Sequence, residues 1–340
     1  MKSRSRPHPR NGSAGRLPRP LLIALCLLAF PFRSPAPLIY RPGEGWTYEP
    51  VGGEGKWQQT RAKDQLEVAQ AAFDKKAYGL ALKAARRVVK VWPLSDFAPQ
   101  AQYLLGRCYE AQGKDEKAFS EYQKLLEKHP KISNYQDILQ RQYIITDRFL
   151  AGKWFRLWGY IPFFPSMERT ADMYAKIVKD GAYSDVAPQA QLKIGAAREK
   201  QHNFPMAVKA YELAADRYND RPPIASEALY RAGLACHKQA QTAEYDQSTA
   251  AQAIATFTDF ITLYPNDPRV PKAQSIILSL KSEQARGNFQ TAKFYDRRKK
   301  WNGALVYYNE VVLQDPNSPY GAEARQRIDT LKRRTQTASK

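Results

Sequence analysis

The stretch that decides the fold is "AQYLLGRCYEAQGKDEKAFSEYQKLLEKHP", residues 101–130. It contains two runs of helical periodicity on either side of a short polar break. The first run carries the small residue Gly106, and the second carries Ala118 with Tyr122 four residues later. Residues spaced by three and four lie on one face of a helix, and Pro130 then stops the second run. The stretch therefore predicts two helices that pack closely through small side chains.

The same second-helix pattern recurs in four further stretches of the chain. An alanine opens the apolar face of each, at Ala81, Ala118, Ala207, Ala253 and Ala304. Four residues later stand Ala85, Tyr122, Tyr211, Phe257 and Tyr308. Each preceding helix has a small residue at a matching place, namely Ala69, Gly106, Gly195, Gly233 and Ala292. An insertion, "AQTAEYDQ", lengthens the break between the two helices that contain Gly233 and Ala253.

This arrangement is similar to the tetratricopeptide repeat, in which Leu-Gly and Tyr of one helix precede Ala, an aromatic residue and Pro of the next. One helix pair cannot bury its apolar face alone, but stacked pairs can. We therefore expect an all-α fold, a superhelical solenoid of five to six helix pairs over residues 61–334, with a polar tail at 335–340.

The unit between Pro130 and Ser184 is irregular. "NYQDILQRQYIITDRFLAG" predicts its first helix and "SMERTADMYAKIVKD" its second, and the aromatic run "GKWFRLWGYIPFFPS", residues 152–166, lies between them. Three interpretations remain open for this insertion: packing on neighbouring helices, a partner-binding surface, or shallow contact with a membrane interface. Its docking candidates are Trp154, Phe155, Trp158, Phe163 and Phe164.

The first residues are typical of an export signal. A basic segment precedes the apolar run "LLIALCLLAF", which is too short for an ordinary membrane-spanning helix. We expect residues 1–36 to be a signal peptide or short membrane anchor, with Cys26 as a lipidation candidate or simply one residue of the apolar run. Residues 37–60 are rich in Gly and Pro and predict a linker.

The composition and the motifs limit the classes of function that we expect for the chain. The chain has 53 basic and 33 acidic residues, a formal charge of +20, which favours acidic partners or an anionic lipid surface. The basic residues are spread over helical faces without a base-reading motif, so we expect no nucleic-acid partner. We find no phosphate-binding loop, no nucleophile elbow and no metal-ligand spacing. The sequence therefore predicts a protein that is not an enzyme and needs no cofactor or metal.

The links between units carry a further resemblance. They are "WPLSDFAPQAQYLLG", "YSDVAPQAQLKIG", "YPNDPRVPKAQ" and "DPNSPYGAEARQRI". Together with the last unit, "AKFYDRRKKWNGALVYYNEVVLQDPNSPYGAEA", they make residues 61–334 resemble the BamD (YfiO) family of outer-membrane assembly lipoproteins. The resemblance implies a non-enzymatic periplasmic scaffold, peripheral to the outer membrane at its inner face. Its early repeats, about 61–130, would face unfolded barrel substrates, and its late repeats, about 225–334, would face a BamA-like insertase.

Positions on the first helix of each unit give candidates for a protein-binding groove. They are Tyr103, Arg107, Tyr230, Lys238, Lys293 and Arg297. Aromatic and cationic side chains together suit a peptide with aromatic residues or a C-terminal carboxylate; ordinary packing or solvation of each residue is the other interpretation. The alternative function is a general periplasmic tetratricopeptide adaptor for cell-envelope or cell-division proteins. Residues 37–60 lack the heptads that such adaptors usually carry.

Overall fold

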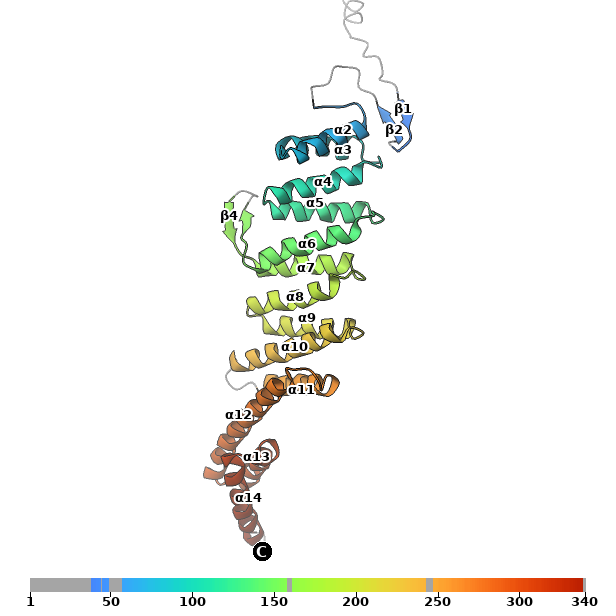
Figure 1. Cartoon of the computed structure of the whole chain (residues 1–340). Helices are drawn as coiled ribbons and strands as arrows, with labels where there is room; N and C mark the ends of the chain where they lie inside the picture. The colour runs from blue at the N-terminus through green and yellow to red at the C-terminus, as the bar shows by residue number, and fades with distance from the viewer. Residues whose placement is uncertain (1–37, 44, 49–56, 158–160, 243–246, 339–340) are drawn as a thin grey trace, which may run out of the picture.

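The computed structural model of the protein describes residues 38–43, 45–48, 57–157, 161–242 and 247–338 (Figure 1). Thirteen helices and two short β-hairpins make up this part of the chain, and the helices stack into an elongated array. The expectation of an all-α repeat solenoid is confirmed. The predicted export signal at 1–36, with Cys26, lies outside the described residues.

Twelve of the helices form six antiparallel pairs, and the last helix packs on the sixth pair. In chain order they are α2 (Ala62–Asp74) with α3 (Tyr78–Val91), α4 (Ala98–Ala111) with α5 (Asp115–Lys128), α6 (Tyr135–Leu150) with α7 (Met167–Asp180), α8 (Ala187–Lys200) with α9 (Phe204–Arg217), α10 (Pro222–Thr242) with α11 (Gln247–Leu263), α12 (Val270–Arg297) with α13 (Trp301–Gln314), and α14 (Pro319–Ala338).

In the second, fourth and fifth pairs, a glycine of the first helix lies where the aromatic ring of the second helix rests on it. A Cβ atom at Gly106 would come within 2.2 Å of the Tyr122 ring, one at Gly195 within 2.4 Å of the Tyr211 ring, and one at Gly233 within 2.7 Å of the Phe257 ring. Only glycine admits such an approach. The spacing seen in the sequence is therefore the close contact between the helices of these pairs.

The turn inside the pairs is also repeated. Lys76, Gly113, His202 and Lys299 follow their first helices with φ between 57° and 68°. The next N–H reaches back to the last helical turn, as in Lys114 N–H to the Tyr109 carbonyl at 2.9 Å. This is the Schellman arrangement that ends a helix with a left-handed residue.

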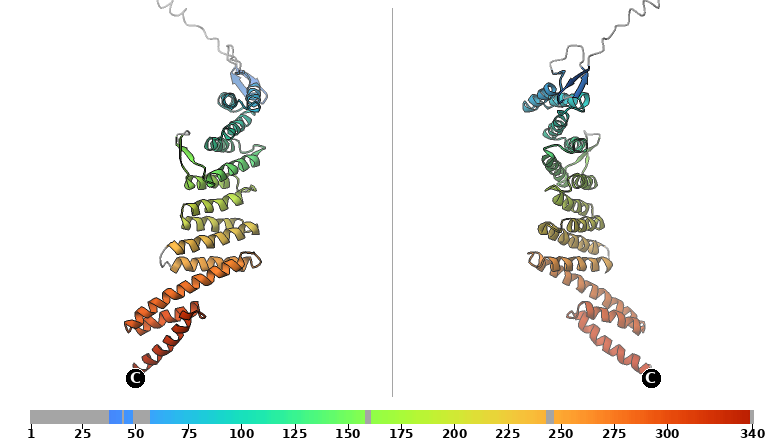
Figure 2. Two further views of the ribbon diagram at one scale, coloured as in Figure 1. Left: turned by 60° about the vertical axis from the view of Figure 1, so that its left-hand side comes forward. Right: turned by 90° about the vertical axis from the view of Figure 1, so that its right-hand side faces the viewer.

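The aromatic insertion occupies this same turn in the third pair. Gly152 ends α6 with φ 106°, and the Lys153 N–H bonds to the Arg148 carbonyl at 3.0 Å as in the other pairs. A hairpin of β3 (Phe155–Leu157) and β4 (Ile161–Phe164) then precedes α7. The hairpin projects from the side of the stack (Figures 1 and 2).

A second hairpin lies in the segment predicted as a linker. β1 (Leu38–Arg41) pairs with β2 (Gly45–Tyr48), and Arg41 stands opposite Gly45. The turn is held against the loop between α3 and α4, because the Gly43 carbonyl accepts a hydrogen bond from the Asp96 N–H at 2.8 Å. The linker expectation missed this hairpin, since its Gly and Pro content hides the two short strands.

Helix α12 joins two parts of the array. Its first half packs with the preceding pairs through Leu280, and its second half forms a separate core with α13 and α14 around Phe289. The helix runs obliquely away from the upper stack (Figures 1 and 2). At its start, Arg269 bonds to Asp267 and Glu227 and lies 4.9 Å from the centre of the Tyr230 ring. These contacts, together with the Phe260 ring 5.6 Å away, join the start of α12 to α10 and α11.

Candidate protein-interaction surface

Two of the groove candidates come together on α4. Tyr103 and Arg107 are one helical turn apart, and the Arg107 guanidinium donates a hydrogen bond to the Tyr103 hydroxyl at 3.3 Å. The same guanidinium lies 5.6 Å from the ring centre of Phe73 on α2. An arginine held between two aromatic rings is a common anchor at protein interfaces.

These residues line a hollow of about 700 Å³ on the side of the first helices. Its walls come from α2, α4 and the loop before α6, and include Leu66, Phe73, Pro99, Tyr103, Arg107 and Ile132. Its aromatic and aliphatic walls suit an apolar side chain, and because Glu67 and Asp96 also line the hollow, Arg107 is the one cation of the lining that can pair with a carboxylate.

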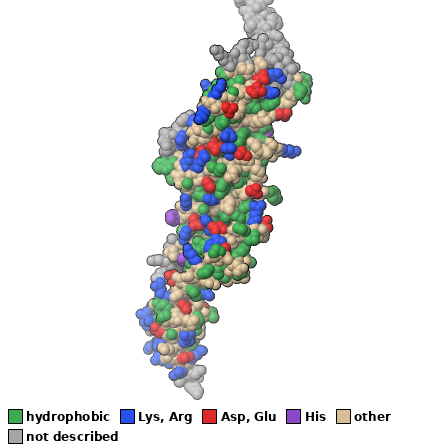
Figure 3. All heavy atoms as spheres, viewed as in Figure 1, with side chains coloured by type: hydrophobic (Ala, Val, Ile, Leu, Met, Phe, Trp, Pro, Cys, Tyr) green, Lys and Arg blue, Asp and Glu red, His purple; other side chains and the backbone are tan. Residues whose placement is uncertain are grey.

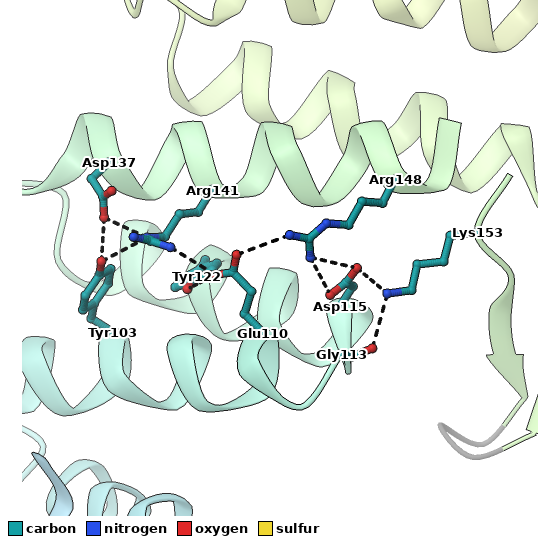
Figure 4. Close-up of polar contacts among 9 residues, drawn as sticks. All are labelled: Tyr103, Glu110, Gly113, Asp115, Tyr122, Asp137, Arg141, Arg148 and Lys153. Atoms are coloured by element: carbon teal, nitrogen blue, oxygen red, sulfur yellow. Dashed lines mark hydrogen bonds and ion pairs between the residues drawn. The ribbon is translucent and has the colours of Figure 1, made fainter. Parts of the chain in front are cut away.

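Tyr103 is also the end of a polar network that reaches α6 (Figure 4). Its hydroxyl donates to Asp137 Oδ2 at 2.6 Å and accepts from Arg141 Nε at 3.0 Å. Partial burial would raise the pKa of Asp137, but the hydrogen bonds from Tyr103 and Arg141 outweigh it and hold that pKa below its usual value. Asp137 therefore stays ionised and fixes the orientation of the tyrosine.

A second centre of the network lies at the hairpin base (Figure 4). The Asp115 carboxylate is fully buried and is paired with Lys153 at 2.6 Å and Arg148 at 3.1 Å. Arg148 also lies 3.8 Å from Glu110 on α4. A buried carboxylate requires such partners, so the network ties α4, α5, α6 and the start of the insertion into one rigid unit.

One repeated contact was missed by sequence reasoning. In four pairs a tyrosine of the second helix donates its hydroxyl proton to a carboxylate at the end of the first helix. The contacts join Tyr122 to Glu110 at 2.9 Å, Tyr211 to Glu199 at 2.7 Å, Tyr308 to Asp296 at 3.3 Å, and Tyr174 to Asp147. A cation from the following unit pairs with each carboxylate, namely Arg141, Lys238, Arg327 and Lys193.

The signal for this contact was present in the sequence. The acid stands twelve residues before the tyrosine in three of the pairs, and the hairpin insertion adds fifteen residues in the other. Burial, followed by the nearby carboxylate, raises the pKa of Tyr122 and Tyr211, so both phenols remain donors. The first and fifth pairs depart from the pattern, with Ala85 and Phe257 in place of the tyrosine.

The late groove candidates do not form one surface with the early ones. Lys238 is paired with Glu199 at 2.7 Å, and Lys293 lies 3.9 Å from Glu323 and 5.2 Å from the centre of the Phe289 ring. Arg297 is exposed at the end of α12. Tyr230 differs from the expectation, because its ring is 7% exposed and is covered by Arg269. It is a packing residue rather than a groove residue.

The docking-loop candidates also include both buried and exposed side chains. Phe155 is buried, stacked on Phe149 with 4.2 Å between ring centres, and Arg169 lies 4.1 Å from its centre. Trp154 and Phe164 are 53% and 44% exposed. Trp158 and the side chain of Phe163 lie outside the described residues. Phe155 thus follows the packing interpretation and holds the hairpin on α6 and α7, while Trp154 and Phe164 are exposed to solvent.

The described residues give no chemical centre of another kind. Within the described ranges, no group of three or more His, Cys, Asp or Glu residues could hold a metal ion, and no helix is long and apolar enough to cross a membrane. Acidic and basic side chains intermingle over the face drawn in Figure 3. Besides the α4 hollow, two smaller hollows of about 360 and 450 Å³ lie along the stack, one beside Leu150 and Arg231 and one beside Phe155 and Arg169.

Comparisons with known proteins support the repeat architecture and one family. Residues 179–324 match the family model YfiO, described as outer membrane lipoprotein, and residues 100–131 match a tetratricopeptide-repeat model. The resemblance to the BamD (YfiO) family is thereby confirmed over the late units. No match is found among curated proteins.

Several solved structures of repeat proteins align with the chain at low identity. The C-terminal part of a tetratricopeptide protein from Cytophaga hutchinsonii is 13% identical, with 78% of this chain and 87% of that chain covered and a TM-score of 0.34. A tetratricopeptide protein from Parabacteroides merdae is 13% identical, with 80% and 98% covered and a TM-score of 0.31. PilF from Pseudomonas aeruginosa is 12% identical, with 78% and 97% covered and a TM-score of 0.25. None of these values supports the transfer of a function.

Proposed function

We propose that this BamD-like tetratricopeptide protein is a non-enzymatic scaffold of the machinery that assembles outer-membrane β-barrel proteins. Tetratricopeptide arrays and the matched family are protein-interaction scaffolds, and that coarser role follows from the fold. The finer proposal assigns the late repeats to a BamA-like insertase and the early repeats to unfolded barrel substrates, at the periplasmic face of the outer membrane.

The observation that carries the proposal is the family match at residues 179–324. It begins at the end of α7 and spans the three last pairs, which include the exposed cations at the α12–α13 turn. Arg297, Arg298, Lys299 and Lys300 are all exposed there. This turn suits an acidic surface on a folded partner.

The early repeats offer a different chemistry. The α4 hollow combines apolar walls with Arg107, and Arg107 is held between Phe73 and Tyr103. An unfolded chain could insert an aromatic side chain between these walls and place a carboxylate on the guanidinium. The two ends of the array would then bind two different partners at the same time.

The decisive experiment is site-specific photo-crosslinking in native envelopes. A benzophenone amino acid replaces Arg297 at the late turn in one variant and Lys83, exposed on α3, in the control variant. We expect a BamA-like protein to be captured from position 297 and not from position 83. Recovery of Tol or peptidoglycan proteins at 297 instead would favour the adaptor function and reject the assembly scaffold. The mass of the N-terminal peptide of the same sample reports whether Cys26 is lipidated, removed or retained.

The early repeats need a separate test with purified protein. The probe is a fluorescent peptide that ends in an aromatic residue with a free carboxylate, as the C-terminal strand of a barrel protein does. Arg107→Ala removes a charge-assisted contact and should weaken binding about tenfold. Lys124→Ala, an exposed cation on α5, is the matched control and should leave binding unchanged. Equal affinities of the two variants would contradict the assignment of the α4 hollow.

A further inference from the structure

The chain contains the same loop twice. "LSDFAPQAQ", residues 94–102, and "YSDVAPQAQ", residues 183–191, differ at two positions only. Both lie between a second helix and the next first helix. In both, the serine N–H bonds to a carbonyl three residues back, at 3.1 Å for Ser95 and 2.8 Å for Ser184.

The local conformations agree as well. The last residue before the helix is Phe97 in one loop, with φ −87° and ψ −14°, and Val186 in the other, with φ −86° and ψ −20°. Both serines are buried and both aspartates are exposed. The residue before each helix therefore has the same backbone conformation, while the serine hydroxyls differ: Ser95 Oγ accepts from the Phe97 N–H at 3.2 Å, and Ser184 Oγ donates to the Gly181 carbonyl at 2.6 Å.

The first loop has a ligand, which is another part of this chain. The Asp96 N–H donates to the Gly43 carbonyl at 2.8 Å, and Ser95 Oγ lies 3.2 Å from the same oxygen. Gly43 lies in the turn between β1 and β2 with φ 77°. A Cβ atom there would meet Asp96 Oδ2 at 3.3 Å, so the backbone comes close because the residue is glycine.

The second loop presents the equivalent donor to solvent. Within the part of the chain that the structure describes, the Asp185 N–H has no acceptor. The neighbouring Tyr183 side chain is 100% exposed, and its counterpart Leu94 stays 94% exposed although the first loop is occupied, so this position lies outside the contact.

Three other loops at equivalent places lack the donor. Arg221, Asp267 and Ser318 take the place of the serine, and each N–H bonds three residues back, to Tyr218, Tyr264 and Asp315. The residue that follows is Pro222, Pro268 or Pro319, and proline has no N–H. The loop before α6 has Ile132 in place of the serine and is a different motif. The serine–aspartate loop with its donor thus belongs to residues 94–97 and 183–186.

We propose that the loop at residues 183–186 binds a glycine β-turn of a partner protein, in the way that residues 94–97 bind the turn at Gly43. The partner's glycine carbonyl accepts a hydrogen bond from the Asp185 N–H. The ligand is thus a β-hairpin whose turn has glycine in the left-handed conformation.

The chain's own hairpin cannot serve both loops. It is attached to α2 at the top of the array, while the second loop lies two pairs further along the stack (Figure 1). A second copy's hairpin is held on its own first loop by the same tether, which gives that contact a high effective concentration. The occupant of the second loop is therefore a different polypeptide. This inference does not depend on which assembly the protein serves.

The test uses the full chain with ¹⁵N labelling and a defined probe. The probe is a backbone-cyclised peptide of the sequence LIYRPGEGWTY, residues 38–48, because an isolated two-stranded hairpin is only marginally stable. We expect a saturable shift of the Asp185 amide resonance while the Asp96 amide stays in place. A second peptide with alanine at the docked glycine should bind about tenfold more weakly, since alanine disfavours a positive φ.

A matched pair of protein variants isolates the N–H. Asp185→Pro removes the donor, and the loops with Pro268 and Pro319 indicate that the fold accepts proline there. Asp185→Ala keeps the donor and removes only the carboxylate. We expect binding, measured by fluorescence of a labelled probe, to be lost in the first variant and kept in the second.

Three results would overturn the proposal. These are no saturable shift at Asp185, a shift confined to Asp96, or equal binding by the proline and alanine variants. If Asp185→Pro does not fold, the comparison of the glycine and alanine peptides on the unmodified chain still decides the question.

Discussion

The substitution Gly106→Ala tests the packing that defines the array. A methyl group at this position would lie 2.2, 2.6 and 2.8 Å from three atoms of the Tyr122 ring. The ring is fully buried and its hydroxyl is bonded to Glu110, so it has little room to move. Overpacking of this kind costs ~3 kcal/mol, and the higher helix propensity of alanine returns about 1 kcal/mol. We therefore expect the free energy of unfolding to fall by ~2 kcal/mol.

Gly79→Ala is the matched control. Gly79 is exposed in the first turn of α3, and a Cβ atom there would meet nothing within 4 Å. Because alanine restricts the unfolded chain without a clash, this variant should be up to ~0.5 kcal/mol more stable than the parent. The same change of residue is thus expected to act with opposite signs at two sites.

The assay is urea unfolding followed by circular dichroism, together with hydrogen exchange of α4 and α5, since repeat arrays can unfold in parts. The double variant Gly106→Ala with Tyr122→Leu should recover at least ~1 kcal/mol relative to the sum of the single changes. A Gly106→Ala variant as stable as the parent, or a strictly additive double variant, would refute the proposed contact.

The remaining predictions concern other contacts of the array. Phe155→Ala should cost ~3 kcal/mol and expose the β3–β4 amides to hydrogen exchange, whereas Trp154→Ala should change the free energy of unfolding by less than ~0.5 kcal/mol; equal effects would contradict the anchoring role of Phe155. Tyr211→Phe, which leaves Glu199 without its phenol donor, should cost ~1 kcal/mol in thermal unfolding, and no cost would mean that Lys238 alone satisfies the carboxylate. Arg269 holds the pKa of Asp267 at about 2 by hydrogen bonding, so the stability that this carboxylate adds is complete above about pH 4 and is lost as the pH falls towards 2. The Arg269→Ala variant should accordingly lose less stability over that pH range than the parent, and parallel curves would exclude the pair as the cause.

The helix pairs were predictable because their signal is local. Steps of three and four residues set the buried face, and the small residue at Gly106 or Gly195 follows from the contact with the ring above it. Even the irregular third pair was predicted, since α6 and α7 each keep their own period across the insertion. The structure of the insertion could not be predicted in this way, because aromatic residues occur both in buried cores and on exposed surfaces.

The buried and exposed residues of the β3–β4 hairpin can be told apart only when the helices next to it are known. Phe155 is buried because Phe149 and Arg169 happen to lie on either side of it, on helices before and after the insertion. Trp154, one residue earlier, points the other way, as adjacent residues of an extended chain do. No property of the aromatic run alone distinguishes these two positions.

The late groove candidates lie apart from the early ones for a related reason. Counting positions along the first helix of each unit assumes that every unit stacks on the last in the same way. The fifth pair departs from that assumption, because Phe257 cannot make the tyrosine–carboxylate contact and α12 runs obliquely away from the preceding pairs. Arg297 therefore lies on a different part of the molecule from Tyr103, beyond a 28-residue helix. The two surfaces proposed for partners, the α4 hollow and the α12–α13 turn, are thus separated along the array by α5 to α11 and by α12 itself. On the proposed function, a partner held at the turn leaves the α4 hollow and the loop at residues 183–186 open to others.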